Sequence, residues 1–206
     1  MTIIAFASGK GGVSKTTLAA SLASYWAREG RSVACVDADP NAHLARWIGR
    51  MAIDGLTCEM ADKNTAIGMV HGLADQHEMV VVDAARMQWF GLTEIAKAAD
   101  LIVIPSMTSD GDTAEVARTY HAVDDLGQAG KAVAILTQAD PRTVVAQHAR
   151  AQIVTDGVPL LKPVMTTRVA YQEAWVRGIA PIDMRSDALA IDIAAIGRAL
   201  NSMATR

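Results

Sequence analysis

The sequence predicts an α/β fold in which a doubly wound, mostly parallel β-sheet carries helices on both faces. Two observations support this prediction. Five short apolar runs, each typical of a buried strand, alternate with stretches of helical periodicity. A glycine-rich turn joins the first apolar run to the first helical stretch, and such turns lie at the carboxyl edge of a parallel sheet, where ligands bind.

The expected strands are short and apolar. They cover residues 3–7, 33–36, 79–82, 101–104 and 133–136, and a sixth short strand is expected at residues 160–164. Helices are expected at residues 16–29, 112–126, 169–176 and 188–203, and Gly30 and Gly127 end the first two. Since no linker, repeat or low-complexity segment divides the chain, we expect a single domain over residues 1–206.

The composition is that of an ordinary globular protein. Of 206 residues, 51% are hydrophobic and 20% are charged, so the chain can bury one sizeable core. Neither a secretory signal nor a run of 18 apolar residues is present, and Cys35 and Cys58 have no metal-ligand spacing. We therefore expect a cytoplasmic protein with reduced thiols, in which Cys35 is a core residue.

The charge is distributed unevenly along the chain. The net charge of −3 does not by itself indicate a nucleic-acid binder. Residues 1–130 carry 10 Lys and Arg against 16 Asp and Glu, whereas residues 131–206 carry 9 against 6. The basic C-terminal third suggests a local patch for phosphates, although scattered solvated charges would give the same count.

The segment after the first predicted strand has the pattern of a phosphate-binding loop. It reads Gly9-Lys10-Gly11-Gly12-Val13-Ser14-Lys15-Thr16-Thr17. Backbone N–H groups of such a turn can wrap a phosphate, and the following helix directs its positive end toward the anion. Lys15 is placed to reach the β- and γ-phosphates, and the Thr16 hydroxyl to hold Mg²⁺. Although the strict pattern requires glycine at Ser14, this near match predicts a P-loop NTPase.

Two aspartates follow the second predicted strand at the same edge of the sheet. Alternation along an extended chain points Asp37 and Asp39 the same way. Two like charges on one face are costly unless a cation or a catalytic role offsets them. For Asp37 the alternative is a simple Asp-Pro turn after the strand.

Three more polar residues lie near strand ends or helix starts. Asp83 ends the run 79–82 and is a candidate to hold Mg²⁺ through water, although a strand-terminal aspartate is often only a turn former. Asp112 opens a predicted helix and could be its N-cap. Gln138 follows the fifth strand, and its side-chain amide could recognise the base of a nucleotide.

Lys10 takes the pattern beyond a generic nucleotide site. The sequence K-G-G-x-x-K-[ST]-T at residues 10–17 resembles the deviant Walker A motif of the ParA/MinD superfamily of ATPases. Three later segments are also similar to that superfamily. They are Asp37-Ala38-Asp39-Pro40-Asn41, the run 101–105 followed by Ser109 and Asp112, and Arg168 to Ala174 followed by Gly178. The resemblance extends from residue 2 to about residue 181.

The resemblance implies roles for individual residues. Lys10 would reach across a subunit interface to the ATP of the partner, so that dimerisation depends on ATP. Asp37 would lie near the metal with Thr16 and Asp83, and Asp39 would orient the attacking water. Lys10, Lys15 and Asp39 are thus the catalytic candidates, and Gln138 stands where relatives often have an adenine-reading asparagine. The segment after Asp83 lacks the usual glycine, which leaves Arg86 either a surface residue or an added phosphate or partner contact.

The short chain is most similar to small ParA-type proteins such as ParF and VirC1. This resemblance implies a slow ATPase that uses ATP and Mg²⁺, forms a homodimer with ATP and binds DNA without sequence preference. A ParB-like protein or cargo adaptor would stimulate hydrolysis, and the ATP-bound form would associate with the nucleoid. The cargo would be a plasmid, a chromosome region or a protein assembly. Candidate DNA contacts are basic residues of the C-terminal third: Arg142, Arg150, Lys162, Arg177, Arg185 and Arg198.

Two alternative functions share the fold. A MinD-like membrane-associated ATPase would need a basic amphipathic last helix. The predicted helix 188–203 has an apolar stripe but no lysine or aromatic residue, so we expect it to pack on its own domain. A metabolic synthase of the dethiobiotin or cobyrinate type would need polar anchors for its substrate, and the sequence shows no additional carboxylate or lysine cluster for them.

Overall fold

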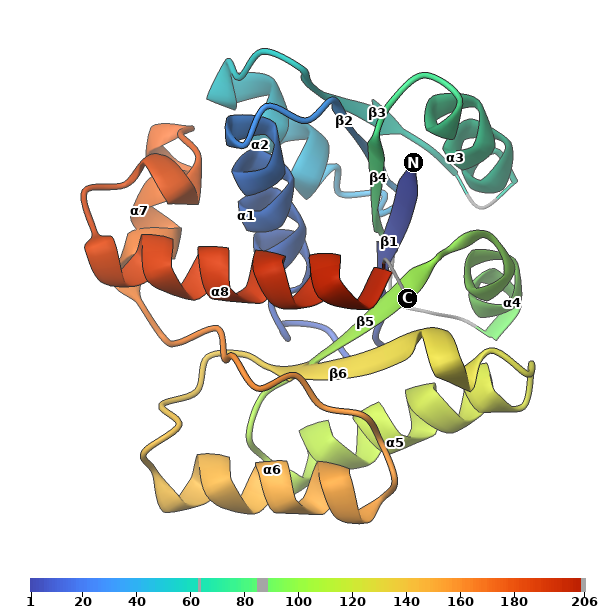
Figure 1. The fold of residues 1–206 in the computed structure, drawn as a ribbon, viewed down its shortest axis with the longest axis vertical. Coiled ribbons are helices and arrows are strands. Elements are labelled where there is room, and N and C mark those ends of the chain that lie inside the picture. Colours follow the sequence, from blue (N-terminus) through green and yellow to red (C-terminus); the bar gives the residue numbers. More distant parts are fainter. Residues whose placement is uncertain (63, 85–88, 205–206) are drawn as a thin grey trace.

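A computed structural model describes residues 1–62, 64–84 and 89–204 of the chain. At its centre lies a six-stranded sheet of order β3-β2-β4-β1-β5-β6, in which every pairing is parallel (Figure 1). The strands are β1 (Thr2–Phe6), β2 (Val33–Asp37), β3 (Leu56–Met60), β4 (Met79–Asp83), β5 (Leu101–Ser106) and β6 (Ala132–Leu136). The predicted fold class, a doubly wound α/β sheet, is confirmed.

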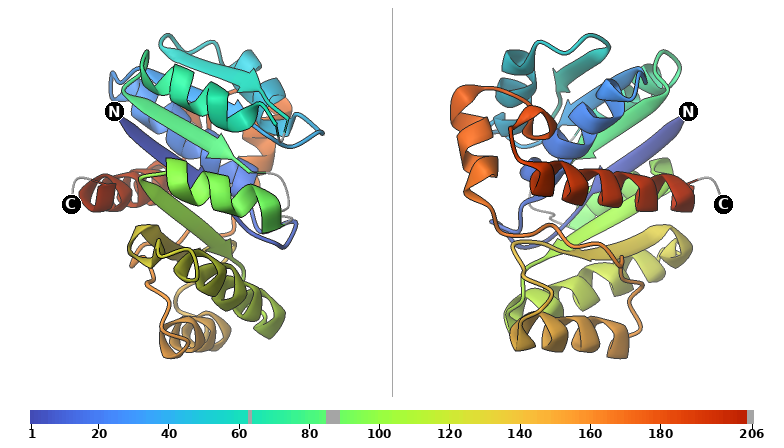
Figure 2. Two further views of the ribbon diagram at one scale, coloured as in Figure 1. Left: turned by 90° about the vertical axis from the view of Figure 1, so that its right-hand side faces the viewer. Right: turned by 60° about the vertical axis from the view of Figure 1, so that its left-hand side comes forward.

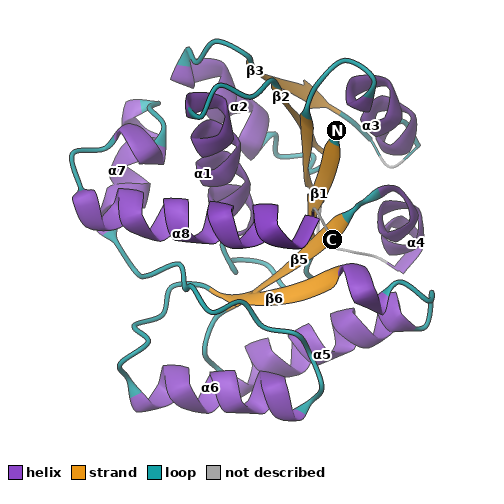
Figure 3. Cartoon of the chain, in the orientation of Figure 1, coloured by secondary structure: helices purple, strands orange, loops and turns teal. Residues whose placement is uncertain are grey.

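Helices cover both faces of the sheet (Figures 2 and 3). One face packs against α1 (Lys15–Arg28), α2 (His43–Met51), α7 (Val169–Arg177) and α8 (Asp187–Ala204). The other face packs against α3 (Ala66–Ala74), α4 (Trp89–Ala98), α5 (Asp110–Asp124) and α6 (Val144–Thr155). Because both faces are covered, β2, β4 and β5 are buried along their whole length.

The sixth strand of the sheet is not the one that the sequence predicts. Residues 160–164 form no strand; they contribute only an isolated bridge between Leu160 and Ala134, and Met165 makes a second bridge to Thr137. The sixth strand is β3, which was not predicted. The partly buried face of β3 packs against α2 and the core, whereas three of the five side chains of this strand are exposed. A half-exposed edge strand therefore lacks the apolar run used to find the others.

The helix boundaries differ slightly from the predicted ones. The first helix begins at Lys15, with Ser14 as its N-cap, and Gly30 follows it with a left-handed φ of 87°. Helix α5 begins at Asp110, two residues earlier than predicted, and its N-cap is Ser109. The interpretation of Asp112 as an N-cap is therefore wrong, because Asp112 is the third helical residue of a capping box with Ser109.

The last helix, α8, packs on its own chain as expected. Leu189, Ile193, Ile196 and Leu200 on its apolar stripe are buried in the core shared with α1. The crossing is close: a Cβ added at Gly197 would lie 2.5 Å from the Tyr25 ring of α1. Across the described ranges 1–62, 64–84 and 89–204, none of the helices is long and apolar enough to cross a bilayer.

Candidate nucleotide site

The candidate site lies where three adjacent strands end. Phe6 of β1, Asp37 of β2 and Asp83 of β4 are aligned in register at the carboxyl edge of the sheet. The loop after β1 is the predicted phosphate loop, and the loop after β2 contains Asp39. Parallel pairing therefore brings together the polar residues that follow separate strands, as the sequence predicts.

The backbone of the phosphate loop has the conformations that its glycines allow. Gly12 has a left-handed φ of 80°, and a Cβ at Gly9 would lie only 2.0 Å from the Glu115 carboxylate of α5. The N–H groups of Gly11, Gly12, Val13 and Ser14 donate to no acceptor among the residues that the structure describes. These groups precede the N-terminus of α1, an arrangement that suits a phosphate.

Thr16 and Asp83 form the oxygen pair expected for Mg²⁺. The Thr16 hydroxyl donates to the Asp83 carboxylate with an oxygen–oxygen distance of 2.6 Å. Burial is the main cause that raises the pKa of Asp83 to about 7; the Thr16 hydrogen bond opposes this rise, and the Asp37 charge adds to it. Carboxylate and hydroxyl oxygens are ligands that Mg²⁺ accepts, so the pair fits this cation.

Asp37 and Asp39 lie in different environments, although the alternation predicts that they point the same way. Asp37 is fully buried, and its two oxygens accept the backbone N–H groups of Asp39 and Ala45, each at 3.0 Å. Asp39 is half-buried and accepts two hydrogen bonds from Asn41. Asp37 thus fixes the turn that presents Asp39.

Lys10 forms an ion pair with the helix that follows β5 in the sequence. Its ammonium lies 2.5 Å from the carboxylate of Asp112 on α5. The Lys10 side chain is 40% exposed, whereas that of Asp112 is 2% exposed. Burial raises the pKa of Asp112, but hydrogen bonds from Lys10 and Ser109 outweigh burial and hold the pKa below its ordinary value. Lys10 is therefore fixed on the surface by its own chain.

The connection after β6 contacts the rim of the phosphate loop. The exposed Gln138 donates from Nε2 to the Gly12 carbonyl at 3.2 Å and to the Ser14 hydroxyl at 2.9 Å. The buried Thr137 donates to the Val13 carbonyl at 3.2 Å. The sequence predicts Gln138 as a base contact, but no local signal in it indicates that Gln138 contacts the phosphate loop.

Comparison with known proteins identifies the family. The family model of the CobQ/CobB/MinD/ParA nucleotide-binding domain matches residues 4–182. The chain belongs to this family. It is thus a ParA/MinD-type member of the deviant Walker A ATPases, as the segment from Lys10 to Thr17 predicts.

The chain is similar to curated proteins at 27–30% identity. Two are proteins named "Maintenance of carboxysome distribution protein A". The one from Gloeobacter kilaueensis is 30% identical over 89% of this chain and 85% of its own length, and the one from Halothiobacillus neapolitanus is 27% identical over 86% and 85%. The solved structure of the cell division ATPase MinD of Pyrococcus furiosus has a TM-score of 0.82 at 17% identity, covering 98% of this chain and 99% of that one. This last likeness shows the fold.

The six basic candidates for DNA contact of this ParA/MinD-type chain do not gather on one element. Arg142, Arg150 and Lys162 lie on α6 or in its flanking segments, whereas Arg177 and Arg185 lie around the connection from α7 to α8; α6 and α7 stand apart in Figure 1. Arg198 is on α8. Three of the six already have partners within the chain. Arg142 pairs with Asp140, and the Arg150 guanidinium donates to the carbonyls of Leu161 and Lys162. Arg177 donates to the Met184 sulfur at 3.9 Å.

Two further residues named from the sequence are Arg86 and Cys35. Arg86 falls outside the described residues. Cys35 is buried in the core as expected, opposite Cys58 of β3.

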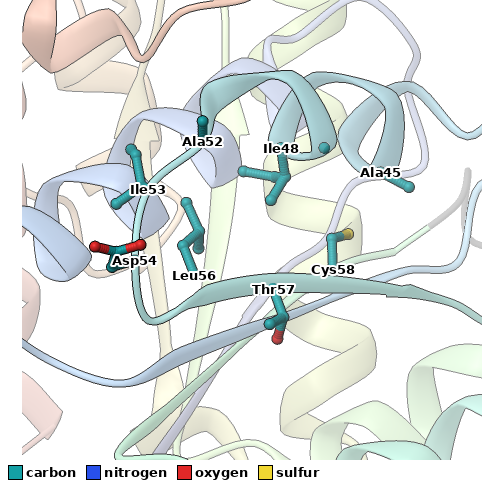
Figure 4. A pocket seen from close by; sticks show the side chains of 9 residues that line it. Ala45, Ile48, Ala52, Ile53, Asp54, Leu56, Thr57 and Cys58 are labelled. Atoms are coloured by element: carbon teal, nitrogen blue, oxygen red, sulfur yellow. The ribbon is translucent and has the colours of Figure 1, made fainter.

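A pocket of about 420 Å³ lies between α2 and β3, lined by Ile48, Leu56 and Cys58 among others (Figure 4). It contains no residue of the phosphate loop, so it is separate from the candidate nucleotide site.

Proposed function

We propose that this ParA/MinD-family ATPase positions a cargo through an ATP-dependent homodimer that binds DNA without sequence preference. A partner protein attached to the cargo stimulates hydrolysis and so releases the dimer. The support comes from the family, from relatives that distribute carboxysomes, and from the placement of Lys10.

The placement of Lys10 is the observation that carries the proposal. A lysine that served its own phosphate loop would turn inward, as the position of Lys15 at the start of α1 allows. Lys10 instead lies on the surface, held by Asp112. A second subunit that approaches this face offers Lys10 the phosphates of another nucleotide in exchange for Asp112. Dimerisation is then coupled to the bound nucleotide.

The other candidate residues have distinct roles in this proposal. Lys15 and the loop N–H groups of residues 11–14 bind the phosphates, and Thr16 and Asp83 hold Mg²⁺, which neutralises phosphate charge when it is bound. Asp39 orients the attacking water. Asp37 keeps the turn around Asp39 in place through its two backbone hydrogen bonds.

The DNA-binding part rests on the basic C-terminal third. Each lysine or arginine that contacts phosphate lowers the salt slope of binding by roughly one when it is removed. The cargo is a protein assembly, a plasmid or a chromosome region. The carboxysome distribution proteins point to the first class, and the chromosome-partitioning ATPase Soj of Thermus thermophilus, 39% identical over 36% of this chain, points to the last.

The test measures binding of the purified protein to non-specific DNA with ATP, with ADP and without nucleotide. Lys10→Ala is compared with Lys97→Ala, a control that removes an exposed lysine paired with Glu94 on α4. We expect native protein and Lys97→Ala to bind DNA only with ATP, and Lys10→Ala to bind ATP but not DNA.

Other outcomes would redirect the proposal. Normal ATP-dependent dimers of Lys10→Ala would remove the role of this lysine. If no nucleotide state binds DNA, vesicle sedimentation with ATP tests the membrane-associated alternative. Turnover that rises only with a small carboxylic acid would instead favour a metabolic synthase.

A further inference from the structure

Two residues that depart from the usual nucleotide-binding patterns contact each other. Ser14 stands where the strict P-loop pattern has glycine, and Gln138 stands where relatives often have asparagine. They are 124 residues apart in the chain, and the Gln138 amide nitrogen lies 2.9 Å from the Ser14 hydroxyl. Both have left-handed backbones, with φ of 68° for Ser14 and 50° for Gln138. A residue other than glycine costs about 1 kcal/mol of stability in that conformation, so the contact joins two residues with strained backbones.

The surroundings fix which end of the Gln138 amide faces the loop. The Gly12 carbonyl, 3.2 Å from Nε2, can only accept a hydrogen bond, so the NH₂ group and not the oxygen must face it. The second hydrogen of this NH₂ group goes to the Ser14 hydroxyl. Both donors of the amide are thereby used, and its oxygen remains as an acceptor on an exposed side chain.

We infer that Ser14 is a positioning residue for base selection, because its hydroxyl and the Gly12 carbonyl together present the Gln138 amide to the nucleotide base as a hydrogen-bond acceptor. An acceptor facing position 6 of a purine pairs with the amino group of adenine. It opposes the carbonyl oxygen of guanine or hypoxanthine. The phosphate loop thus contributes to reading the base. Only the nucleotide-binding part of the proposed function is needed for this role.

The test uses diphosphates, so that neither hydrolysis nor dimerisation enters the measurement. Calorimetry gives the Kd values of ADP, IDP and GDP for the native chain. IDP carries the 6-carbonyl of guanine without its 2-amino group and so isolates position 6. We expect ADP to bind more tightly than IDP, and Ser14→Ala and Gln138→Leu each to reduce this preference about threefold to tenfold, the range for one hydrogen bond. In the Gln138→Leu background, adding Ser14→Ala should change the preference no further.

Ser14→Gly is the matched control for backbone strain. It lacks the hydroxyl, as Ser14→Ala does, but it relaxes the left-handed backbone. If Ser14 acts by positioning, both variants have the same ratio of IDP to ADP Kd values while their unfolding midpoints differ. If Ser14→Ala fails to fold, Ser14→Gly still tests the ratio.

Four results would overturn the inference. The first is a native chain that binds ADP and IDP equally. The second is an unchanged ratio in the single variants. The third is an effect of Ser14→Ala that persists when Gln138 is leucine. The fourth is a preference of ADP over 2′-deoxy-ADP that Gln138→Leu abolishes, because the amide oxygen would then meet the ribose and not the base.

Discussion

The buried carboxylate of Asp83 makes the stability of the metal-free protein depend on pH. Its pKa of about 7 in the folded chain lies above the ordinary value of 3.8. The folded state therefore binds this proton more tightly than the unfolded state does. The stabilising contribution of the proton is complete below about pH 4 and is lost as the pH rises through 7.

Asp83→Asn removes this dependence. Without Mg²⁺ and nucleotide, we expect the variant to gain stability relative to the native chain as the pH rises from 5 to 8, by about 2–4 kcal/mol. Urea unfolding at the two pH values measures the difference. Mg²⁺ should then stabilise the native chain at pH 8 and leave the variant unchanged. A difference that stays constant with pH would contradict the assigned burial effect.

The ion pair between Lys10 and Asp112 should oppose dimerisation. Asp112→Asn keeps an oxygen for the capping box but removes the charge that holds Lys10. If Lys10 of each subunit must leave Asp112 to reach the other subunit, two ion pairs are broken per dimer. At about 0.5 kcal/mol for each partly exposed pair, the variant should dimerise with ATP at a protein concentration about fivefold lower. Sedimentation velocity measures the midpoint.

The matched control for this change is Asp110→Asn, which alters an exposed aspartate in the first turn of the same helix. Its dimerisation midpoint should equal that of the native chain. A midpoint that rises in Asp112→Asn would mean that the ion pair orients Lys10 for the dimer and does not restrain it.

At the residue scale, the sequence predicts local chemistry better than long-range contacts. Lys15, Thr16 and Asp83 could be assigned because each lies at a fixed offset from a strand or a glycine. The partners of Lys10 and Ser14 could not, because Asp112 and Gln138 reach them only through strand order. Burial likewise separates Asp37 from Asp39, which alternation alone treats as equivalent.

At the scale of elements, the crossing of α8 over α1 depends on a glycine. Gly197→Ala would place a methyl group 2.5 Å from the Tyr25 ring, so we expect a loss of about 1–3 kcal/mol in the free energy of unfolding. The same change at Gly68, an exposed residue in the first turn of α3 where an added Cβ would meet no atom within 4 Å, should instead stabilise by about 0.5–1 kcal/mol. Denaturant unfolding of both variants checks the opposite signs. Equal effects would contradict the close packing of α8 on α1.

The strands illustrate when hydrophobic patterns suffice. Five buried strands could be predicted because helices cover both of their faces and require apolar runs. The edge strand β3 is not predicted from the sequence, whereas the apolar residues 160–164 are wrongly predicted to form a strand. That segment contributes Leu161 and Val164 to the core without continuous pairing. Apolar character thus predicts burial there but not strand geometry.

At the scale of the whole molecule, a nucleotide should stabilise the fold because separate elements form its site. The loop after β1, the end of β4 and the connection after β6 are brought together only by folding. At a nucleotide concentration about 100 times its Kd, we expect a gain of about 2.7 kcal/mol. Urea unfolding with and without Mg²⁺ and ADP measures the gain, and Lys15→Ala should abolish it. A full gain in Lys15→Ala would place the nucleotide elsewhere.

The contacts of the phosphate loop show why its sequence alone would not form the same site in another protein. One wall comes from α5, through the contacts of Gly9 with Glu115 and of Lys10 with Asp112, and the other comes from the connection after β6. Both walls belong to parts of the chain that follow β5. Residues 8–17 grafted onto a foreign strand and helix would bring the glycines but neither wall. A transplanted loop would therefore also need the contacts that α5 and the connection after β6 provide.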